Sequence, residues 1–239
     1  MPEFDNTKYD LPSDQADNSK LNKLRAAVLG ANDGIVSTSS VVMGVAGATG
    51  DAKAITLAGL AALVAGALSM AVGEYVSVSS QSDAEKAYIR LEKEDLRDNP
   101  EYELDELARE YVKHGLSEKT AHIVAAELTE TDALKAHLRM HFNIDPEEVV
   151  SPWHAAVASL LAFTVGGIIP FVAIIVSPAA WRIPLTVVAV VISLIAVGLV
   201  SAHVGNASKV RAVLRVVVGG VVAMLATYGV GILFGATIA

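Results

Sequence analysis

Five long apolar stretches dominate the pattern of hydrophobic and polar positions along the chain. They lie near residues 26–48, 54–79, 155–176, 183–202 and 212–237. About 20 apolar residues of helix are enough to cross the hydrocarbon core of a bilayer. Stretch 183–202 is apolar on every face, whereas a surface helix of a soluble protein has a polar face that recurs with a period of 3.6 residues. The pattern therefore predicts an all-α integral membrane protein with five transmembrane helices.

The segment between the second and third predicted spans is polar and has the pattern of short helices. Leu104, Leu107 and Tyr111 form an apolar stripe at helical spacing, and Asn99-Pro100 and Gly115 are typical helix boundaries. We expect helices over about 80–97, between Pro100 and Gly115, from Ser117, and from Thr131-Asp132 to near Phe142. The predicted organisation is a polar cytosolic tail at 1–23, two spans in 24–80, a helical cytosolic domain at 81–152 and three spans in 153–239.

Charge is concentrated in that central segment. The chain is 53% hydrophobic and 18% charged, with a mean hydropathy of +0.47 and a net charge of −8. Residues 81–152 hold nine basic and eighteen acidic residues, so the rest of the chain is nearly neutral. Basic residues flank the spans on one side, which by the positive-inside rule places the N-terminus and the central segment in the cytosol and the C-terminus outside. The absence of Cys excludes disulfides and thiolate metal sites.

Two acidic residues lie within predicted spans. A charged side chain at that depth costs about 2.5–3.5 kcal/mol on insertion scales, so Asp33 and Glu74 are expected to face the bundle interior or a pathway. Met70 is four residues before Glu74 and shares its helix face, which suits a transition metal that binds and then leaves. Alternatives are that Asn32-Asp33-Gly34 is a turn outside a shorter span and that Met70 only packs in the core.

The central segment presents potential metal ligands at helical spacing. The carboxylates are Glu92, Asp95, Glu103 and Glu106, and near the end of the last predicted helix stand His137 and His141 with Met140 beside them. Hard oxygen ligands from two helices suit Fe(II), Mn(II), Mg(II) or Ca(II). The carboxylates could instead form a solvated acidic surface, and the histidines could act electrostatically at the helix C-terminus.

Enzyme signatures are missing from the sequence. There is no Gly-Lys-Ser/Thr phosphate loop, no Gly-x-Ser-x-Gly elbow and no His-Glu-x-x-His motif. We therefore expect a protein that is not an enzyme, carries no prosthetic group and has no nucleic-acid partner. Without an ATP site, transport would be driven by an ion gradient.

Several motifs together resemble the vacuolar iron transporter family. They are Asn32-Asp33-Gly34-Ile35-Val36, Ser69-Met70-Ala71-Val72-Gly73-Glu74-Tyr75-Val76-Ser77, Pro100-Glu101 with Glu103-Leu104 and Glu106-Leu107, and Gly115-Leu116-Ser117. The resemblance covers roughly residues 22–239. It implies a five-span homodimer in a lipid bilayer that moves Fe(II) or Mn(II) out of the cytosol in exchange for protons. The tail at 1–23 is too short for the ferritin-like domain of some bacterial relatives.

The resemblance also implies roles for individual residues. Asp33, Met70 and Glu74 would form the translocation path along the dimer interface, and Glu92, Asp95, Glu103, Glu106 and Met140 would match the metal-collecting site of the cytosolic domain. Two departures stand out: Asp95 replaces a common Glu, and Met140-His141-Phe142 replaces a stretch that is often Asp-Glu-Leu. A membrane-anchored metal sensor or store is the alternative function. The compact, Cys-free chain favours a bacterial cell membrane over a vacuolar one.

Overall fold

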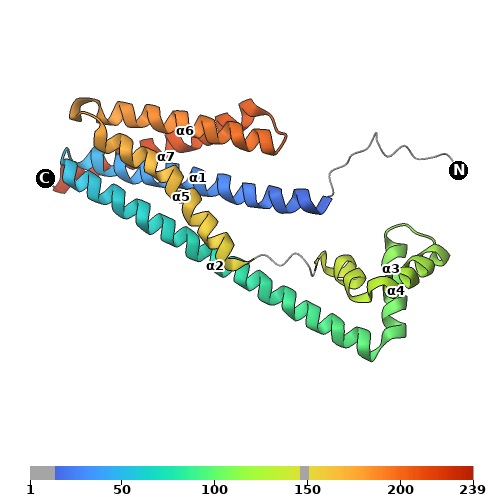
Figure 1. Ribbon diagram of the computed structural model, residues 1–239. Coiled ribbons are helices and arrows are strands. Elements are labelled where there is room, and N and C mark those ends of the chain that lie inside the picture. The colour runs from blue at the N-terminus through green and yellow to red at the C-terminus, as the bar shows by residue number, and fades with distance from the viewer. Residues whose placement is uncertain (1–13, 146–150, 239) are drawn as a thin grey trace. The chain divides into compact units, whose positions relative to one another are not determined.

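The structure is a computed structural model that describes the backbone of residues 14–145 and 151–238 and the side chains of 26–145 and 151–235. The described residues form helices and no strand, which confirms the all-α prediction. The elements are α1 (Asp14–Ala48), α2 (Ala52–Asp98), α3 (Pro100–Lys113), α4 (Glu118–Phe142), α5 (Pro152–Val176), the short 3₁₀ helix η2 (Ala179–Trp181), α6 (Arg182–Val204) and α7 (Lys209–Ile238) (Figure 1). They divide into two compact units, which we call the membrane unit (1–74 and 153–239) and the helical insert (75–152).

The five predicted spans are confirmed. Five helical segments of the described chain are long and apolar enough to cross a membrane, namely Ala26–Ala48, Ala52–Asp98, Pro152–Val176, Ala179–Val204 and Lys209–Gly235. The helix α2 has 47 residues and is therefore about 70 Å long, more than twice the length needed for a span. Its second half carries the chain into the helical insert, as the polar continuation after residue 80 predicted.

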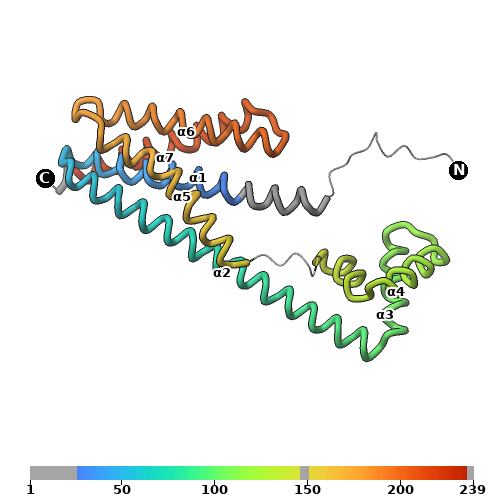
Figure 2. Tube along the Cα trace, in the orientation of Figure 1, coloured from blue at the N-terminus to red at the C-terminus, as the bar shows by residue number. Residues whose placement is uncertain are grey.

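The first helix lies at the centre of the membrane unit. On one side, Ile35 and Met43 of α1 pack with an apolar cluster from α6 and α7 that consists of Val190, Leu194 and Met224. On another side, Val42 packs with Ile55 of α2 and Ile174 of α5. Figure 2 shows the traces of α6 and α7 running alongside α1. Any group on α1 in this region is therefore held by neighbours on several sides.

Helices α1 and α5 cross with their backbones in contact. A Cβ atom on Gly34 would lie 2.1 Å from the carbonyl oxygen of Phe163, and one on Gly166 would lie 2.1 Å from the carbonyl oxygen of Ala31. Only glycine fits at these two positions without moving a helix. Small residues serve this purpose widely in membrane proteins, because without a hydrophobic driving force helices associate by close packing.

The helical insert has its own apolar core between α3 and α4. Leu107 and Ala108 of α3 pack against Ala121 and Ala125 of α4, and all four are buried. The predicted boundaries hold. Helix α3 starts at Pro100, and the chain after it turns at Gly115 with a φ of 99°, in the left-handed region that glycine tolerates. The side chain of Ser117 then caps α4 by accepting from the Thr120 amide at 3.3 Å.

Helix α4 contains a kink where the sequence predicted a new helix. Asp132 has φ −164° and ψ 90°, and its Oδ1 accepts a hydrogen bond from the Lys135 amide at 2.9 Å, which is an N-cap interaction. The part after the kink, up to Phe142, is thus a separate helical segment with its own direction. At the other end of the chain, α1 starts at Asp14, so part of the predicted tail at 1–23 has helical backbone. Residues 1–13 lie outside the described residues.

Candidate metal centre

Three helices of the insert bring two carboxylates and two imidazoles together. His137 Nδ1, from the kinked end of α4, lies 2.8 Å from Glu92 Oε1 of α2 and 3.5 Å from Glu103 Oε2 of α3. The His141 ring lies one turn further along α4, with its centroid 5.3 Å from that of His137. Glu92, His137 and His141 each present one ligand atom within 4.8 Å of those of the other two. Three ligand atoms at this spacing are close enough together to bind one metal ion.

The side chains at this centre are buried, and several of their polar atoms have no hydrogen-bond partner in the described chain. His137 is 0% exposed, Glu92 5% and Glu103 6%. Within the described chain, Glu92 Oε1, both ring nitrogens of His137 and His141 Nε2 are buried and lack a protein partner in hydrogen-bond geometry. Buried polar atoms in folded proteins nearly always have partners, so four such atoms in one place require an explanation.

The short distance between Glu92 and His137 is consistent with shared coordination. The two atoms are close enough for a hydrogen bond, but the contact does not have the angles of one. Two ligand atoms that are each about 2.1 Å from a metal ion at right angles lie about 3 Å apart, with their lone pairs directed at the ion rather than at each other.

Local structure explains how the histidines reach α2. The kink at Asp132 redirects the end of α4, and the Tyr88 ring of α2 stacks on the Phe142 ring at a centroid distance of 4.5 Å. Tyr88 and Glu92 lie one turn apart on α2, and His137 and Phe142 lie five residues apart at the end of α4, so two contacts join the two helices. The sequence analysis did not find the aromatic contact. Its only sequence signal is the spacing of Tyr88 before Glu92.

Burial changes the proton affinity of these groups. Desolvation is the largest cause that raises the pKa of Glu92, followed by a smaller lowering effect of His141 and raising effects of Asp95 and Glu106. Desolvation likewise raises the pKa of Glu103, and the neighbouring carboxylates add to it. The pKa of His137 is lowered, first by desolvation and then by His141. The metal-free centre thus resists charge, and a cation would offset the cost of its ionised carboxylates.

The chain was compared with known proteins. The VIT family model matches residues 24–232. The chain belongs to the VIT family. It is 41% identical to a vacuolar iron transporter of Acanthamoeba castellanii over 88% of this chain and 78% of that protein. It is 38% identical to vacuolar iron transporter homolog 2 of Arabidopsis thaliana over 96% and 95% of the two chains, and 38% identical to vacuolar iron transporter homolog 1 of rice over 89% and 74%. The predicted family resemblance is confirmed.

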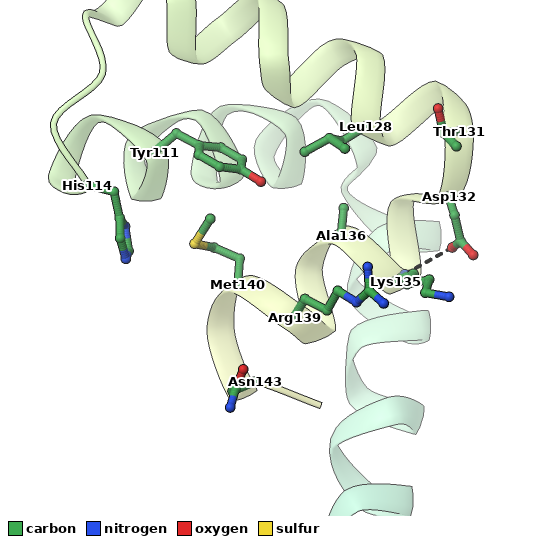
Figure 3. Close-up of a pocket in the computed structure, with 10 residues that line it drawn as sticks. All are labelled: Tyr111, His114, Leu128, Thr131, Asp132, Lys135, Ala136, Arg139, Met140 and Asn143. Atoms are coloured by element: carbon green, nitrogen blue, oxygen red, sulfur yellow. Dashed lines mark hydrogen bonds between the residues drawn. The ribbon is translucent and has the colours of Figure 1, made fainter. Parts of the chain in front are cut away.

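The other predicted ligands of this VIT-family chain lie around the centre or away from it. Asp95 is exposed and Glu106 half-buried, and both act on Glu92 through their charge. Met140 instead packs against the apolar core of the insert and borders a cavity of about 500 Å³. Figure 3 shows its thioether beside Tyr111 in that cavity. The structure therefore brings together Glu92, Glu103, His137 and His141, while Met140 faces the core between α3 and α4.

The three predicted path residues lie in the membrane unit of this VIT-family chain. Asp33 is inside α1, so the alternative of a turn outside a shorter span is wrong, and its Oδ1 accepts a hydrogen bond from Ser37 at 2.6 Å. Met70 packs against the cluster of Leu63, Ala67 and Phe163, and Glu74 is half-buried. Among the described side chains, no recorded contact joins any of the three to another. Their role as a path remains a prediction.

Proposed function

We propose that this VIT-family protein is a divalent transition-metal transporter that moves Fe(II), Mn(II) or both out of the cytosol in exchange for protons. The observation that carries the proposal is the centre in the insert, where Glu92, His137 and His141 each offer one ligand atom and four of their buried polar atoms lack partners in the described chain. Relatives that match most of the chain are named vacuolar iron transporters or their homologs, which supports iron as one cargo.

The donor set of the centre suits a borderline transition metal. Carboxylate oxygens alone suit Mg(II), Ca(II) and Mn(II), whereas imidazole nitrogen suits Fe, Zn, Cu and Ni. Two imidazoles with two carboxylates therefore favour Fe(II) over the hard cations that are abundant in cells. In the proposed cycle, the insert gathers the ion and passes it to the membrane unit.

The two acids of the membrane unit are proposed to exchange the metal ion for protons. An unpaired, charged carboxylate in a membrane interior has a high free energy. Binding of either a cation or a proton lowers it. Asp33 is in addition held by the Ser37 hydroxyl. Met70 and Glu74 share a face of α2, and a second copy of the chain would supply the groups that these three residues do not find within one chain. The proposed unit is therefore a homodimer.

The proposed orientation follows from the basic residues that flank the spans. It places the N-terminus and the insert in the cytosol and the C-terminus outside. The ion would then enter from the side on which the insert lies. We propose the bacterial cell membrane rather than a vacuolar membrane as the location.

Flux measurements in proteoliposomes test the proposal. Fe(II), kept reduced, or Mn(II) should move across the membrane at a rate that depends on an imposed pH gradient. Asp33→Asn should abolish that flux. Asp51→Asn is the matched control, because Asp51 is exposed and caps α2 through the Lys53 amide, a role that Asn also fills. Undiminished flux through Asp33→Asn would remove Asp33 from the path.

The alternative function is that of a membrane-anchored metal sensor or store. The observation that favours it is that the centre lies wholly within the insert. This function requires metal binding by the insert and no flux. The same vesicles distinguish the two: metal binding by the full chain together with no metal movement under any pH gradient would establish the alternative.

A further inference from the structure

Five hydroxyl groups of the membrane unit, on α5, α6 and α7 or directly after α5, share one hydrogen-bond pattern. Each donates a hydrogen bond to the backbone carbonyl four residues earlier, and the residues are Thr164, Ser177, Thr186, Ser193 and Thr227. This is the ordinary way in which the hydroxyl groups of Ser and Thr find a hydrogen-bond acceptor in a membrane helix. Thr38 of α1 departs from it. Its side chain is 0% exposed, and its Oγ1 has no protein hydrogen-bond partner in the described chain.

Thr38 is directed at the backbone of α5. A Cβ atom built on Gly167 would lie 2.6 Å from Thr38 Oγ1 and 3.1 Å from the carbonyl oxygen of Gly34. The contact belongs to the crossing of α1 and α5 at which Gly34 and Gly166 bring the two backbones together. The Thr38 hydroxyl therefore lies against α5 at Gly167, where Leu63 Cδ1 of α2 is equally close to that Cβ position at 2.6 Å, and the carbonyl of the preceding residue, Gly166, belongs to the same turn of α5.

The carbonyl of Gly166 lacks the backbone N–H donor that it would have in an uninterrupted helix. Pro170 lies inside α5, and proline has no N–H with which to bind the carbonyl four residues earlier, which is that of Gly166. Inside a membrane there is no bulk water to replace the missing donor. Prolines are tolerated in such helices because groups such as Ser and Thr hydroxyls satisfy the freed carbonyl. An unpartnered hydroxyl and a carbonyl deprived of its donor thus occur at the same helix crossing.

We propose that Thr38 is a positioning residue for transport, whose hydroxyl donates to the Gly166 carbonyl, left without its usual donor by Pro170, when α1 and α5 take a relative position slightly different from that of the structure. The inference rests on the proposed transport function. Thr38 stands five residues after Asp33, about 7.5 Å further along the axis of α1. A bond from Thr38 to α5 therefore sets the position of the helix that carries Asp33.

The bond is sensitive to the relative position of the two helices. In the structure Thr38 Oγ1 lies against Gly167 without bonding, so rotation of its side chain or a small slide of α1 along the glycine crossing is needed to reach the Gly166 carbonyl. A contact that forms at one position and breaks at another gives two states different energies. A transporter that alternates between two states can use such a difference.

A double-mutant cycle tests the pairing. Thr38→Val removes the hydroxyl with little change of shape, and Pro170→Ala restores an amide donor to Gly166. We expect Thr38→Val to slow the initial metal flux into proteoliposomes by about three- to fivefold, the rate equivalent of about 0.6–1 kcal/mol. In the Pro170→Ala background the same substitution should change flux by less than about 1.5-fold. An equal slowing in both backgrounds, or none in the first, would overturn the pairing.

Three controls separate positioning from a general effect on folding. Thr186→Val removes a hydroxyl that serves only its own helix and should leave flux unchanged when the protein remains folded. Thr38→Ser keeps the donor and should restore flux. Metal affinity of the insert, which Thr38 does not touch, should be the same in every variant. If Thr186→Val slows flux as much as Thr38→Val, the positioning role is wrong.

The pairing can fail separately from transport. Absence of flux in the unaltered protein would refute the proposed function. In that case, thermal unfolding of the four proteins of the cycle tests the contact between Thr38 and Gly166 without reference to transport. The same measurement tests the contact if Pro170→Ala by itself stops flux. A smaller loss of Tm from Thr38→Val in the Pro170→Ala background supports the pairing, and strictly additive changes overturn it.

Discussion

Acidic side chains are held in different ways in the membrane unit and in the helical insert. In the membrane unit, Asp33 is held by Ser37 of its own helix. In the insert, Glu92 and Glu103 come from separate helices and meet at His137, which leaves several ligand atoms without protein partners. The first contact lies within one turn of helix. The second brings together three helices and leaves polar atoms to which a metal ion could bind.

The two regions therefore differ in how many potential metal ligands one folded chain brings together. The insert collects donors from α2, α3 and α4 at a single point, with a cost of burial that a cation offsets. In the membrane unit, Met70 packs on the apolar cluster around Phe163 rather than beside Asp33. Metal binding at the insert should therefore be separable from events in the membrane unit.

The largest expected effect is loss of metal affinity in His137→Ala. This substitution removes the one side chain that contacts both carboxylates, so the affinity of the insert for Fe(II) or Mn(II) should fall by at least about 100-fold. Titration calorimetry of the full chain in detergent measures it. The exposed His122 provides the control as His122→Ala, and Asp33→Asn should also leave the affinity of the insert unchanged. A comparable loss in Asp33→Asn would mean that the two regions form one site.

A smaller effect concerns the pH dependence of stability. The raised pKa of Glu92 means that its contribution to stability is fully present below its ordinary value of 4.5 and is lost as the pH rises through its value in the folded protein. The lowered pKa of His137 acts in the opposite direction: its contribution is present above 6.5 and is lost as the pH falls through the folded value. Above pH 4.5, the metal-free insert therefore bears a cost for the buried Glu92 carboxyl that is absent at lower pH.

Glu92→Gln tests this sign. Without metal, the variant should melt a few degrees higher than the unaltered protein at about pH 7.5 and at nearly the same temperature at about pH 4. Added Mn(II) should raise the Tm of the unaltered protein and not that of the variant. Glu94→Gln, an exposed neighbour on the same helix, should behave as the unaltered protein. If Glu92→Gln lowers the Tm at the higher pH, Glu92 is stabilising without metal and the interpretation of the centre is wrong.

The smallest effect is expected at the kink of α4. Asp132→Ala removes the cap of the segment that carries both histidines, and caps of this kind contribute about 1 kcal/mol. The Tm should fall by about 2–4 °C, with a severalfold loss of metal affinity because the histidines are held less firmly. Asp132→Asn retains a capping oxygen and should restore both. Unchanged affinity in Asp132→Ala would show that the Tyr88–Phe142 stack alone positions the end of α4.

The sequence by itself determined the five spans, the helix boundaries within the insert and the family. Length and hydropathy are sufficient for a span, because a membrane helix satisfies all of its backbone hydrogen bonds internally. The boundaries at Pro100, Gly115 and Ser117 were equally local, since turn and capping chemistry involves only residues a few positions apart. The new helix at Asp132 was predicted for the same reason.

Only the tertiary structure decided which candidate ligands meet. Helical spacing made Glu92 and Asp95 equivalent, and the packing of α4 against α2 buries Glu92 while Asp95 stays exposed. It likewise directs His137 to the carboxylates and Met140 to the apolar core. The special position of Thr38 depends on Pro170, more than a hundred residues away. Spacing along a helix fixes which side chains share a face, but what that face meets depends on the helices packed against it, and these come from distant parts of the chain.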